Sequence, residues 1–361
     1  MMNDKCLHFG SCGGCSAQGL SVEEYRAWKE SLIIKALREG NINAEIEPMV
    51  SCPLHSRRRI ELSAVKVKGI VNLGFKVYHK NEIIDIVECH VGIPQILHRM
   101  DIIRKIAVLV DQNDEFRINL LWTETGLDVT LKGVKSIGEK TRRALIDTAI
   151  EGGLARLNLA NETLIEIVKP VIKFGTVYVS VSPGGFVQAV EYAEKEISKI
   201  ALKHLKSCKF VADLFSGSGS FTFPALVNAK VHAFEFDKQA INAMQTAYKK
   251  QNKGLKELRV TPRDLFNLPV TAKELSLYDG LIFDPPRAGA EAQAHEIAKS
   301  NIRKVVAISC NVNSLIVDLN ILQNAGYIIE KIIPIDQFLW SEHCELVALL
   351  SRKNKKTGCK L

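Results

Sequence analysis

The sequence predicts a doubly wound parallel α/β sheet in its C-terminal half, preceded by an α+β region and a short cysteine-rich segment. In the C-terminal half, apolar runs such as residues 281–283 and 305–309 stop abruptly at polar residues, as buried parallel strands do. Between residues 46 and 181, short runs alternate apolar and polar side chains, which is typical of half-buried antiparallel strands. We therefore expect three parts, residues 1–20, 21–185 and 186–361.

Composition and charge narrow the class of protein. The chain has 361 residues, of which 47% are hydrophobic and 24% charged, and its net charge of +8 suits a polyanionic partner, although many basic proteins bind none. No stretch has the length of a transmembrane helix and the first residues do not resemble a signal peptide, so we expect a cytoplasmic protein with no membrane partner. We also expect a monomer. In a reducing cytosol, nine cysteines favour metal binding, catalysis and burial over disulfides.

Three cysteines lie close together near the N-terminus, on a glycine-rich stretch whose flexible backbone can wrap one centre: Cys6, Cys12 and Cys15. Closely spaced thiolates suit zinc or an iron–sulfur cluster, and both need a fourth ligand. The downstream candidates are Cys52, Cys89, His8 and His90. We favour Cys89, because it follows the strand-like residues 82–87 and is thereby fixed in place. The alternative is three free thiols in a flexible tail.

The α+β region begins with a helix expected over residues 21–39. Ser21 caps its N-terminus with Glu24 three residues later, and Gly40 ends it. Further amphipathic helices are expected over residues 93–110 and 141–157. The expected strands include residues 60–65, 71–75, 127–131 and 176–181.

The densest basic run is residues 57–59, three consecutive arginines. Adjacent guanidinium groups can bind phosphates. Such a run is equally typical of a solvated strand start, and the sequence leaves both interpretations open.

A cofactor site is expected where the C-terminal region begins. A helix over residues 191–206 leads into a strand at 210–214, which ends in a Gly-x-Gly loop at 217–219 and opens another helix. The next strand, residues 230–235, ends at Glu235, about twenty residues beyond the glycines. In a doubly wound fold such an acid accepts hydrogen bonds from ribose hydroxyls.

Two features favour S-adenosylmethionine over a nicotinamide dinucleotide. The loop lacks the third glycine that helps to seat a pyrophosphate. A further acid, Asp264, follows residues 260–263, where it can accept a hydrogen bond from an adenine amino group. Methyl transfer is therefore favoured over hydride transfer.

The reactive groups are expected at two neighbouring strand ends. Asp284 follows the strand at 281–283, and two prolines and Arg287 form a rigid corner behind it. Cys310 follows the strand at 305–309, so a carboxylate and a thiol share one crevice. This set suggests covalent chemistry on a planar ring. The alternative is a proline turn next to an inert, buried cysteine.

These residues resemble the uracil-5 RNA methyltransferase family, whose members make 5-methyluridine in ribosomal and transfer RNA. The resemblance covers nearly the whole chain, and the segment 284–289 is a very specific motif. It also includes residues 74–76, 186–188, 213–219, 309–311 and 336–345, and the cysteines at positions 6, 12, 15 and 89.

The resemblance implies a class I methyltransferase fold that binds S-adenosylmethionine. It also implies a 4Fe-4S cluster held by Cys6, Cys12, Cys15 and Cys89. Since these cysteines lie far in sequence from the reaction centre, we expect the cluster to be structural or to face the RNA.

The resemblance implies roles for individual residues as well. Gln188 would contact the cofactor or the uracil, and Phe215 lies in the cofactor loop. Cys310 would add to uracil C6, C5 would take the methyl group, and Glu345 would remove the C5 proton. Asp284 would orient the uracil or the cofactor. The expected product is 5-methyluridine, with ribosomal RNA favoured over transfer RNA.

Two other functions stay open at this point. An amino-group methyltransferase acting on nucleic acid or protein would use a related Pro-Pro corner and would need neither Cys310 nor Glu345. A non-enzymatic alternative is a metal-stabilised RNA-binding module with an inactive methyltransferase domain.

Overall fold

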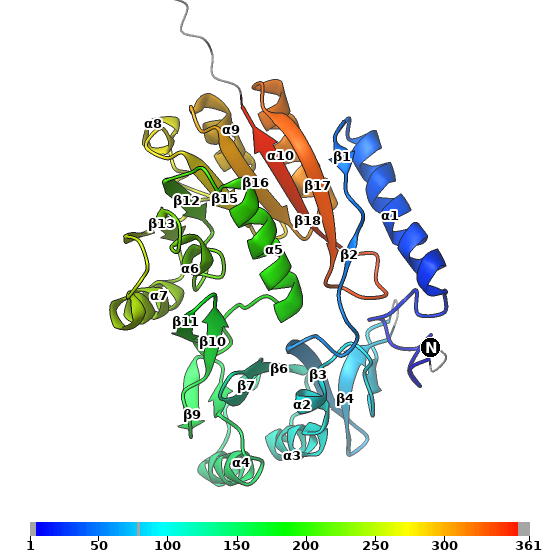
Figure 1. Ribbon diagram of the computed structural model, residues 1–361. Helices are drawn as coiled ribbons and strands as arrows, with labels where there is room; N and C mark the ends of the chain where they lie inside the picture. Colours follow the sequence, from blue (N-terminus) through cyan, green and yellow to red (C-terminus); the bar gives the residue numbers. More distant parts are fainter. Residues whose placement is uncertain (1–4, 78–79, 353–361) are drawn as a thin grey trace, which may run out of the picture.

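The computed structural model describes residues 5–77 and 80–352, so that residues 1–4, 78–79 and 353–361 lie outside the described part. Two regions stack on one another (Figure 1): a large sheet flanked by helices, and below it a smaller sheet. No helix in the described part of the chain is long and apolar enough to cross a membrane.

The upper region is built on one large sheet. Its strands are β1 (Glu45–Ile46), β2 (Val50–Ser51), β12 (Phe210–Leu214), β13 (Lys230–Glu235), β14 (Leu258–Pro262), β15 (Gly280–Phe283), β16 (Lys304–Ser309), β17 (Ile328–Asp336) and β18 (Glu345–Ser351). They lie in the order β1-β17-β18-β16-β15-β12-β13-β14, with β2 also paired to β17. Strands β12 to β16 are parallel, whereas β18 runs antiparallel to both of its neighbours. The carboxyl ends of β12 to β16 therefore share one edge of the sheet.

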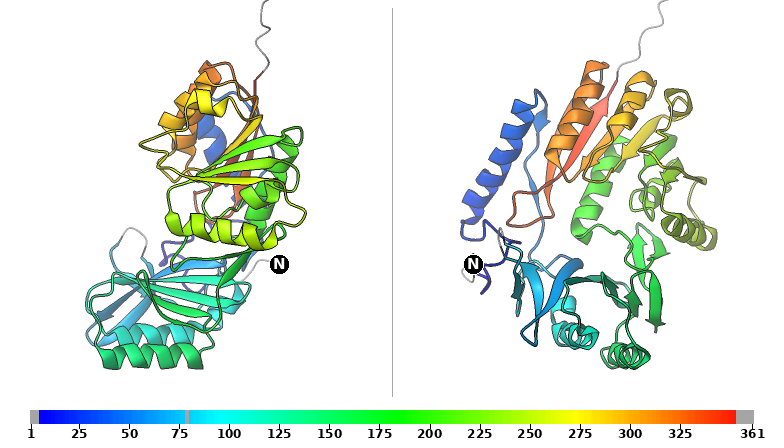
Figure 2. Two further views of the ribbon diagram at one scale, coloured as in Figure 1. Left: turned by 90° about the vertical axis from the view of Figure 1, so that its left-hand side faces the viewer. Right: turned by 180° about the vertical axis from the view of Figure 1, so that it is seen from behind.

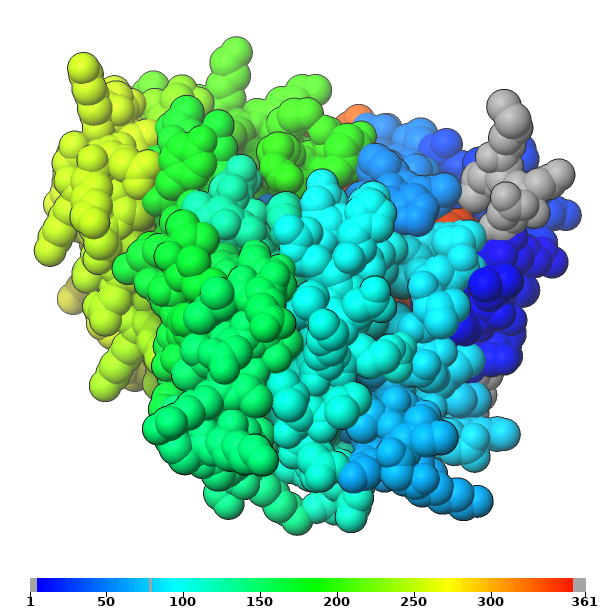
Figure 3. Space-filling model, turned by 90° about the horizontal axis from the view of Figure 1, so that it is seen from below, coloured from blue at the N-terminus to red at the C-terminus, as the bar shows by residue number. Residues whose placement is uncertain are grey.

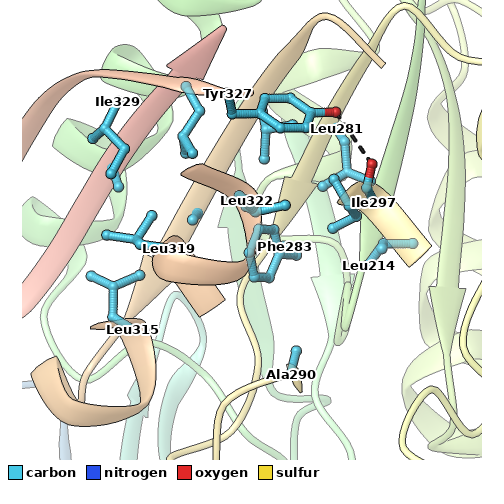
Figure 4. Close-up of a cluster of buried hydrophobic side chains, with 14 of the residues drawn as sticks. Leu214, Leu281, Phe283, Ala290, Ile297, Leu315, Leu319, Leu322, Tyr327 and Ile329 are labelled. Atoms are coloured by element: carbon cyan, nitrogen blue, oxygen red, sulfur yellow. Dashed lines mark hydrogen bonds between the residues drawn. The ribbon is translucent and has the colours of Figure 1, made fainter. Parts of the chain in front are cut away.

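Helices cover both faces of this sheet, as Figure 2 shows from two sides. One face carries α1 (Val22–Glu39), α8 (Ala272–Leu275), α9 (Glu291–Lys299) and α10 (Val312–Asn324), and the other carries α5 (Glu191–His204), α6 (Thr222–Ala225) and α7 (Lys238–Gln251). Because side chains alternate along a strand, Phe283 packs with Leu319 and Leu322 in the first core (Figure 4), while Ile282 packs in the second. The doubly wound fold expected from the sequence is confirmed.

The lower region is an α+β unit, as expected. Its strands are β3 (Arg59–Val67), β4 (Ile70–Lys76), β5 (Ile83–Asp85), β6 (Phe116–Thr123), β7 (Gly126–Lys132), β8 (Arg156–Leu159) and β9 (Glu162–Glu166). They lie in the order β5-β4-β3-β6-β7-β8-β9. The helices are α2 (Pro94–Leu97), α3 (Met100–Val110) and α4 (Glu139–Glu151), and α3 and α4 lie side by side below the sheet (Figure 1). The hairpin β10 (Val171–Phe174) and β11 (Val177–Ser180) leads into the upper region.

Two helices of the lower region differ from the expectation. The helix expected over residues 93–110 is two helices, because Arg99 leaves the helical conformation between them. The helix expected over residues 141–157 ends at Glu151, since Gly152 caps it and Gly153 adopts a positive φ of 60°. The apolar residues that extended the helical pattern belong to β8 and the segment before it.

Helix α1 has the expected capping box between Ser21 and Glu24 and ends at Gly40. Its position differs from the expected grouping with residues 21–185. Ile33 and Leu37 pack in the core of the upper region, and β1 and β2 pair with β17. Residues 22–51 thus belong by packing to the large sheet, although they precede the lower region in sequence.

The N-terminal segment lies where the two regions meet, and Figure 3 shows it against the edge of the lower region. The Gly13 N–H donates to the Lys76 carbonyl at the end of β4, with an N–O distance of 2.9 Å. The Ser16 and Ala17 N–H groups both donate to the Trp340 carbonyl, with N–O distances of 2.8 and 3.0 Å. The segment therefore connects the lower sheet to the loop between β17 and β18.

Candidate active site

Three reactive side chains meet at neighbouring strand ends. Asp284 directly follows β15, Cys310 directly follows β16, and Glu345 is the first residue of β18. In the antiparallel β16–β18 pair, Ser309 lies opposite Leu346, so the next position outward sets Cys310 beside Glu345. This register brings together residues that are far apart in sequence.

Two glutamine amides join the two acids. The Gln188 Nε2 donates to Asp284 Oδ2 at 3.0 Å, and the Gln337 Nε2 donates to Gln188 Oε1 at 3.3 Å and to Glu345 Oε2. Gln188, Gln337 and Glu345 are all buried. The acids are therefore linked by neutral amides. Gln337 was not singled out in the sequence, and its only signal is its place in the motif at residues 336–345.

The electrostatics of this crevice favour protonated groups. Burial and, next, the negative charge of Asp284 raise the pKa of Glu345. Burial also raises the pKa of Asp284. The Cys310 thiol has its pKa raised to about 11, first by burial and then by Glu345 and Asp284, whereas the Arg287 guanidinium lowers it. Each of these acids is held in an environment that disfavours its charged form.

A further acid, Asp213, lies at β12. The Thr222 Oγ1 donates to its Oδ2, while its Oδ1 is buried and has no hydrogen-bond partner in the described part of the chain. Burial raises the pKa of Asp213 to about 7, and Asp284 and Glu235 add to this effect. The sequence contained Asp213 in a motif but gave no reason to choose it as a site residue.

The expected cofactor residues surround the loop after β12. Glu235 Oε2 accepts the Gly217 N–H at 2.8 Å, and so ties the end of β13 to this loop. Phe215 has a positive φ of 60°, and its ring centroid lies 5.4 Å from that of Phe266. At Gly219, where φ is 102°, a Cβ would lie 2.8 Å from the Phe223 ring, so only glycine fits without rearrangement.

Asp264 holds the turn that follows β14. Its Oδ1 accepts the N–H groups of Phe266 and Asn267 at 3.1 and 3.3 Å, and its Oδ2 accepts from the Asn267 side chain at 2.7 Å. Since β14 lies beside β13, Asp264 and Glu235 occupy adjacent strand ends. Both acids therefore stand at the edge where a doubly wound fold binds its ligand.

The four cysteines expected to bind metal line one cavity of about 360 Å³. These are Cys6, Cys12, Cys15 and Cys89. Burial and then the other three thiols raise the pKa of Cys15 to about 12, so their sulfur atoms are near one another. Within residues 5–77 and 80–352, no set of three or more His, Cys, Asp or Glu side chains is arranged to hold a single metal ion.

The alternative fourth ligands have other positions or partners. Cys52 is buried in the core of the upper region beside α5. His8 Nε2 accepts the Val87 N–H at 3.0 Å, and His90 Nδ1 lies 3.3 Å from the Gln18 amide nitrogen. Cys89 is thus the downstream thiol that faces the other three.

Comparison with known proteins identifies the family. The family model for tRNA (uracil-5-)-methyltransferase matches residues 176–353. An uncharacterized RNA methyltransferase of Brucella suis is 44% identical over 351 residues, which cover 97% of this chain and 84% of the relative. The chain belongs to the uracil-5 RNA methyltransferase family. The family and the enzyme class expected from the sequence are therefore confirmed.

A solved structure agrees with this methyltransferase in fold, and a more distant relative agrees in sequence. The crystal structure of Pyrococcus abyssi tRNA (uracil-54, C5)-methyltransferase with S-adenosyl-L-homocysteine superposes with a TM-score of 0.71 at 21% identity, covering 94% of this chain and 84% of that chain. The 23S rRNA (uracil(1939)-C(5))-methyltransferase RlmD of Shewanella woodyi is 28% identical, covering 96% of this chain and 81% of the relative. The class I methyltransferase fold is thereby confirmed.

Proposed function

We propose that this protein transfers a methyl group from S-adenosylmethionine to C5 of a uridine in RNA, and that ribosomal RNA is the preferred substrate. The observation that carries the proposal is the convergence of Cys310 and Glu345, from adjacent strands, with Asp284 in one crevice. A thiol beside a buried carboxylate fits addition to a pyrimidine ring followed by elimination.

The first step is addition of the Cys310 thiolate to uracil C6, after the thiol has lost its proton to solvent. The S–C6 bond forms, the π electrons of C5–C6 move toward the C4 carbonyl, and C5 becomes nucleophilic. Arg287 favours this step, because its guanidinium lowers the thiol pKa that burial and the two carboxylates raise. Asp284 orients the ring and is itself fixed by the Gln188 amide.

The second step is methyl transfer to C5. The residues that fit S-adenosylmethionine are Glu235 for the ribose, Asp264 for the adenine, and Phe215 in the loop between them. The cofactor, when bound, would supply an electrophilic sulfonium methyl group and would leave as the neutral thioether S-adenosylhomocysteine, which keeps the electron pair of the broken S–CH3 bond. Both reactants meet at one edge of the sheet, which lowers the entropic cost of the step.

The third step removes the C5 proton. Glu345 accepts it, the C–H electron pair restores the C5–C6 double bond, and the Cys310 thiolate leaves. A carboxylate whose pKa is raised is a better base near neutral pH than an exposed one. Gln337 fixes the direction of the Glu345 carboxylate by donating to it.

We further propose that Cys6, Cys12, Cys15 and Cys89 hold a 4Fe-4S cluster. Four thiols lining one cavity fit the ligand set, and the Gly14 N–H donates to Cys12 Sγ at 3.5 Å. The Arg57 guanidinium lies near Cys15 and Cys89, and its buried Nε has no hydrogen-bond partner among the described residues. Its charge suits an anionic cluster. Since methyl transfer moves no net electrons, the cluster would supply rigidity.

The visible absorbance spectrum distinguishes a 4Fe-4S cluster from zinc. Protein purified without oxygen is expected to be brown, with a broad band toward the blue, and to contain iron and sulfide. A colourless protein that contains one zinc ion per chain would instead show that the four cysteines bind zinc.

The substrate class is tested by mapping. Ribosomal RNA is favoured because the Shewanella woodyi relative, similar along 96% of the chain, is named for 23S rRNA. We expect a deletion strain to lose 5-methyluridine from ribosomal RNA, and the purified protein, but not Cys310→Ala, to restore it. Loss confined to transfer RNA would overturn the preferred substrate, and loss of an N-methylated base would indicate an amino-group methyltransferase.

A further inference from the structure

The three arginines at residues 57–59 do not all point the same way, because consecutive side chains of an extended chain lie on opposite sides of the backbone. Arg58 turns into the protein, where its Nε donates to the Gln188 carbonyl at 3.2 Å and its Nη2 lies 2.9 Å from Glu194. Arg58 is buried and its charge is paired. Because side chains alternate along extended chain, Arg57 and Arg59 share the opposite side.

Arg59 lies against an exposed aromatic ring. Its guanidinium carbon is 4.4 Å from the centroid of the Phe186 ring, and Phe186 is 63% exposed. The next residue, Val187, is only 1% exposed, so the chain turns one side chain outward and the next inward. A large apolar ring held at the surface by a stacked guanidinium is a preformed flat surface.

This ring stands beside the proposed catalytic crevice. Phe186 is two residues from Gln188, whose amide donates to Asp284. Two residues of extended chain span at most about 7 Å. A group attached directly to a uridine held at Gln188 is therefore within reach of Phe186.

The cation that stacks on the Phe186 ring is Arg59. Within residues 5–77 and 80–352, neither Arg57 nor Arg59 has a carboxylate oxygen within 4.0 Å. Burial and then the charge of Arg57 lower the pKa of Arg59 to about 10, which indicates that the two guanidinium groups repel each other. Because Arg59 is not paired with a carboxylate, its charge favours an anionic ligand such as the backbone of RNA.

We propose that Phe186 and Arg59 form a stacking seat for the base next to the target uridine. The inference rests on the proposed function, because it takes RNA as the ligand. A uridine that leaves its stack separates from its neighbour, whose exposed face then needs a new partner. Aromatic rings and guanidinium planes supply that partner, and they accept any base because every base has a π face.

The test pairs a protein variant with a missing base. The probe is a single-stranded heptanucleotide with one central uridine, together with two derivatives that are abasic on the 5′ or the 3′ side of that uridine. Binding is measured by fluorescence anisotropy at low salt. Phe186→Ala is expected to weaken binding of the intact probe about tenfold. It should have no further effect on the derivative that lacks the stacked base.

Two further variants sharpen the result. Arg59→Lys keeps the charge but loses the planar group, and it is expected to weaken binding of the intact probe severalfold. Tyr178→Ala is the matched control, since Tyr178 is 45% exposed and pairs with Lys173 at 5.4 Å on the β10–β11 hairpin. It should leave binding unchanged. Unaltered thermal unfolding of all variants confirms that they fold.

The outcomes separate the seat from the reaction. Equal effects of Phe186→Ala on the intact probe and on both abasic probes, or no effect on any, would overturn the seat. If wild-type protein still methylates RNA from a deletion strain in that case, the proposed function stands alone. If Phe186→Ala weakens binding of the intact probe but not of one abasic probe, and no RNA is methylated, the stacking seat is supported and the proposed function is contradicted.

Discussion

At the scale of residues, the crevice is organised by the two glutamines between Asp284 and Glu345. Two buried acids that are close together do not both ionise readily, and neutral amides do not compensate them as a cation would. Their protonation is therefore a property of the pair. This arrangement makes the Glu345 carboxylate a stronger base, and the share of protein that carries it deprotonated grows as pH rises.

The role of Glu345 is tested by Glu345→Gln. Without a base, the C5 proton stays and Cys310 is not released, so we expect turnover to fall at least about a hundredfold while a covalent protein–RNA adduct accumulates. The adduct is measured on denaturing gels after incubation with RNA from a deletion strain and S-adenosylmethionine. Glu151→Gln, at the exposed end of α4, is the control and should turn over normally. Normal turnover by Glu345→Gln would contradict this role.

The raised pKa values predict a dependence on pH. Cys310 reacts as the thiolate and Glu345 as the carboxylate, and the pKa of each is raised in the folded protein. Deprotonation of both groups therefore increases as pH rises, so kcat/KM should climb from pH 6 to pH 9. Arg287→Met removes the charge that lowers the thiol pKa and should move the rise to higher pH. A flat profile above pH 6 would be inconsistent with this environment.

The sequence could predict these residues only in part. Asp284 and Cys310 end apolar strand patterns, so their shared crevice follows from the topology of parallel strands. Glu345 starts a strand, and its position depends on the antiparallel register of β18, which the sequence does not state. Gln337 is one of many glutamines, and its importance follows only from its hydrogen bonds.

At the scale of elements, helix α1 fixes the loop between β17 and β18. The fully buried Lys29 Nζ donates to Asp336 and to the Phe338 carbonyl, the latter at 2.9 Å. The Tyr25 hydroxyl donates to Asp336 Oδ2 at 2.8 Å and accepts the Trp340 N–H at 2.8 Å. A helix from the start of the chain thus holds the loop that leads to the proposed base.

This ion pair predicts a stability effect. Lys29→Met leaves the Asp336 charge buried without its cation, and we expect the free energy of unfolding to fall by about 3–5 kcal/mol. Urea unfolding measures this, with the exposed Lys35→Met on the same helix as control, expected within about 0.5 kcal/mol of wild type. The double variant Lys29→Met/Asp336→Leu should recover much of the loss. Equal effects of Lys29→Met and Lys35→Met would refute the pairing.

Helix α1 also shows which properties of an element the sequence predicts and which it does not. Its capping box and its end at Gly40 follow from local rules and were predictable. Its packing partner was not, because an apolar stripe of a helix does not specify which sheet it covers. The broken helix before α3 and the early end of α4 were missed because apolar spacing continued across residues that leave the helical conformation.

At the scale of the whole molecule, the cysteine segment joins the two regions. Gly13 binds the end of β4, while Ser16 and Ala17 bind Trp340 in the loop before β18. Ala17, Tyr25 and Trp340 also share a small apolar core. A metal cluster that orders this cysteine segment therefore also orders the loop that leads to Glu345.

Loss of the metal cluster should make that loop more mobile while the strands of the large sheet stay protected. Cys15→Ser, or removal of the metal by a chelator, is expected to abolish the visible absorbance and to speed amide hydrogen exchange over residues 336–345. Strands β15 and β16 should keep their protection, because their cores lie elsewhere. Unchanged exchange in the loop, or equal loss of protection throughout, would contradict a local role.

In the proposed reaction, the Cys310 sulfur forms a bond with uracil. RNA that contains 5-fluorouridine tests it directly, since fluorine at C5 blocks the final elimination. With S-adenosylmethionine, we expect a stable complex whose mass equals protein, RNA and one methyl group, with the modified peptide containing Cys310. Cys310→Ala should form none. An adduct on another cysteine, or methylation that proceeds in Cys310→Ala, would contradict the claim.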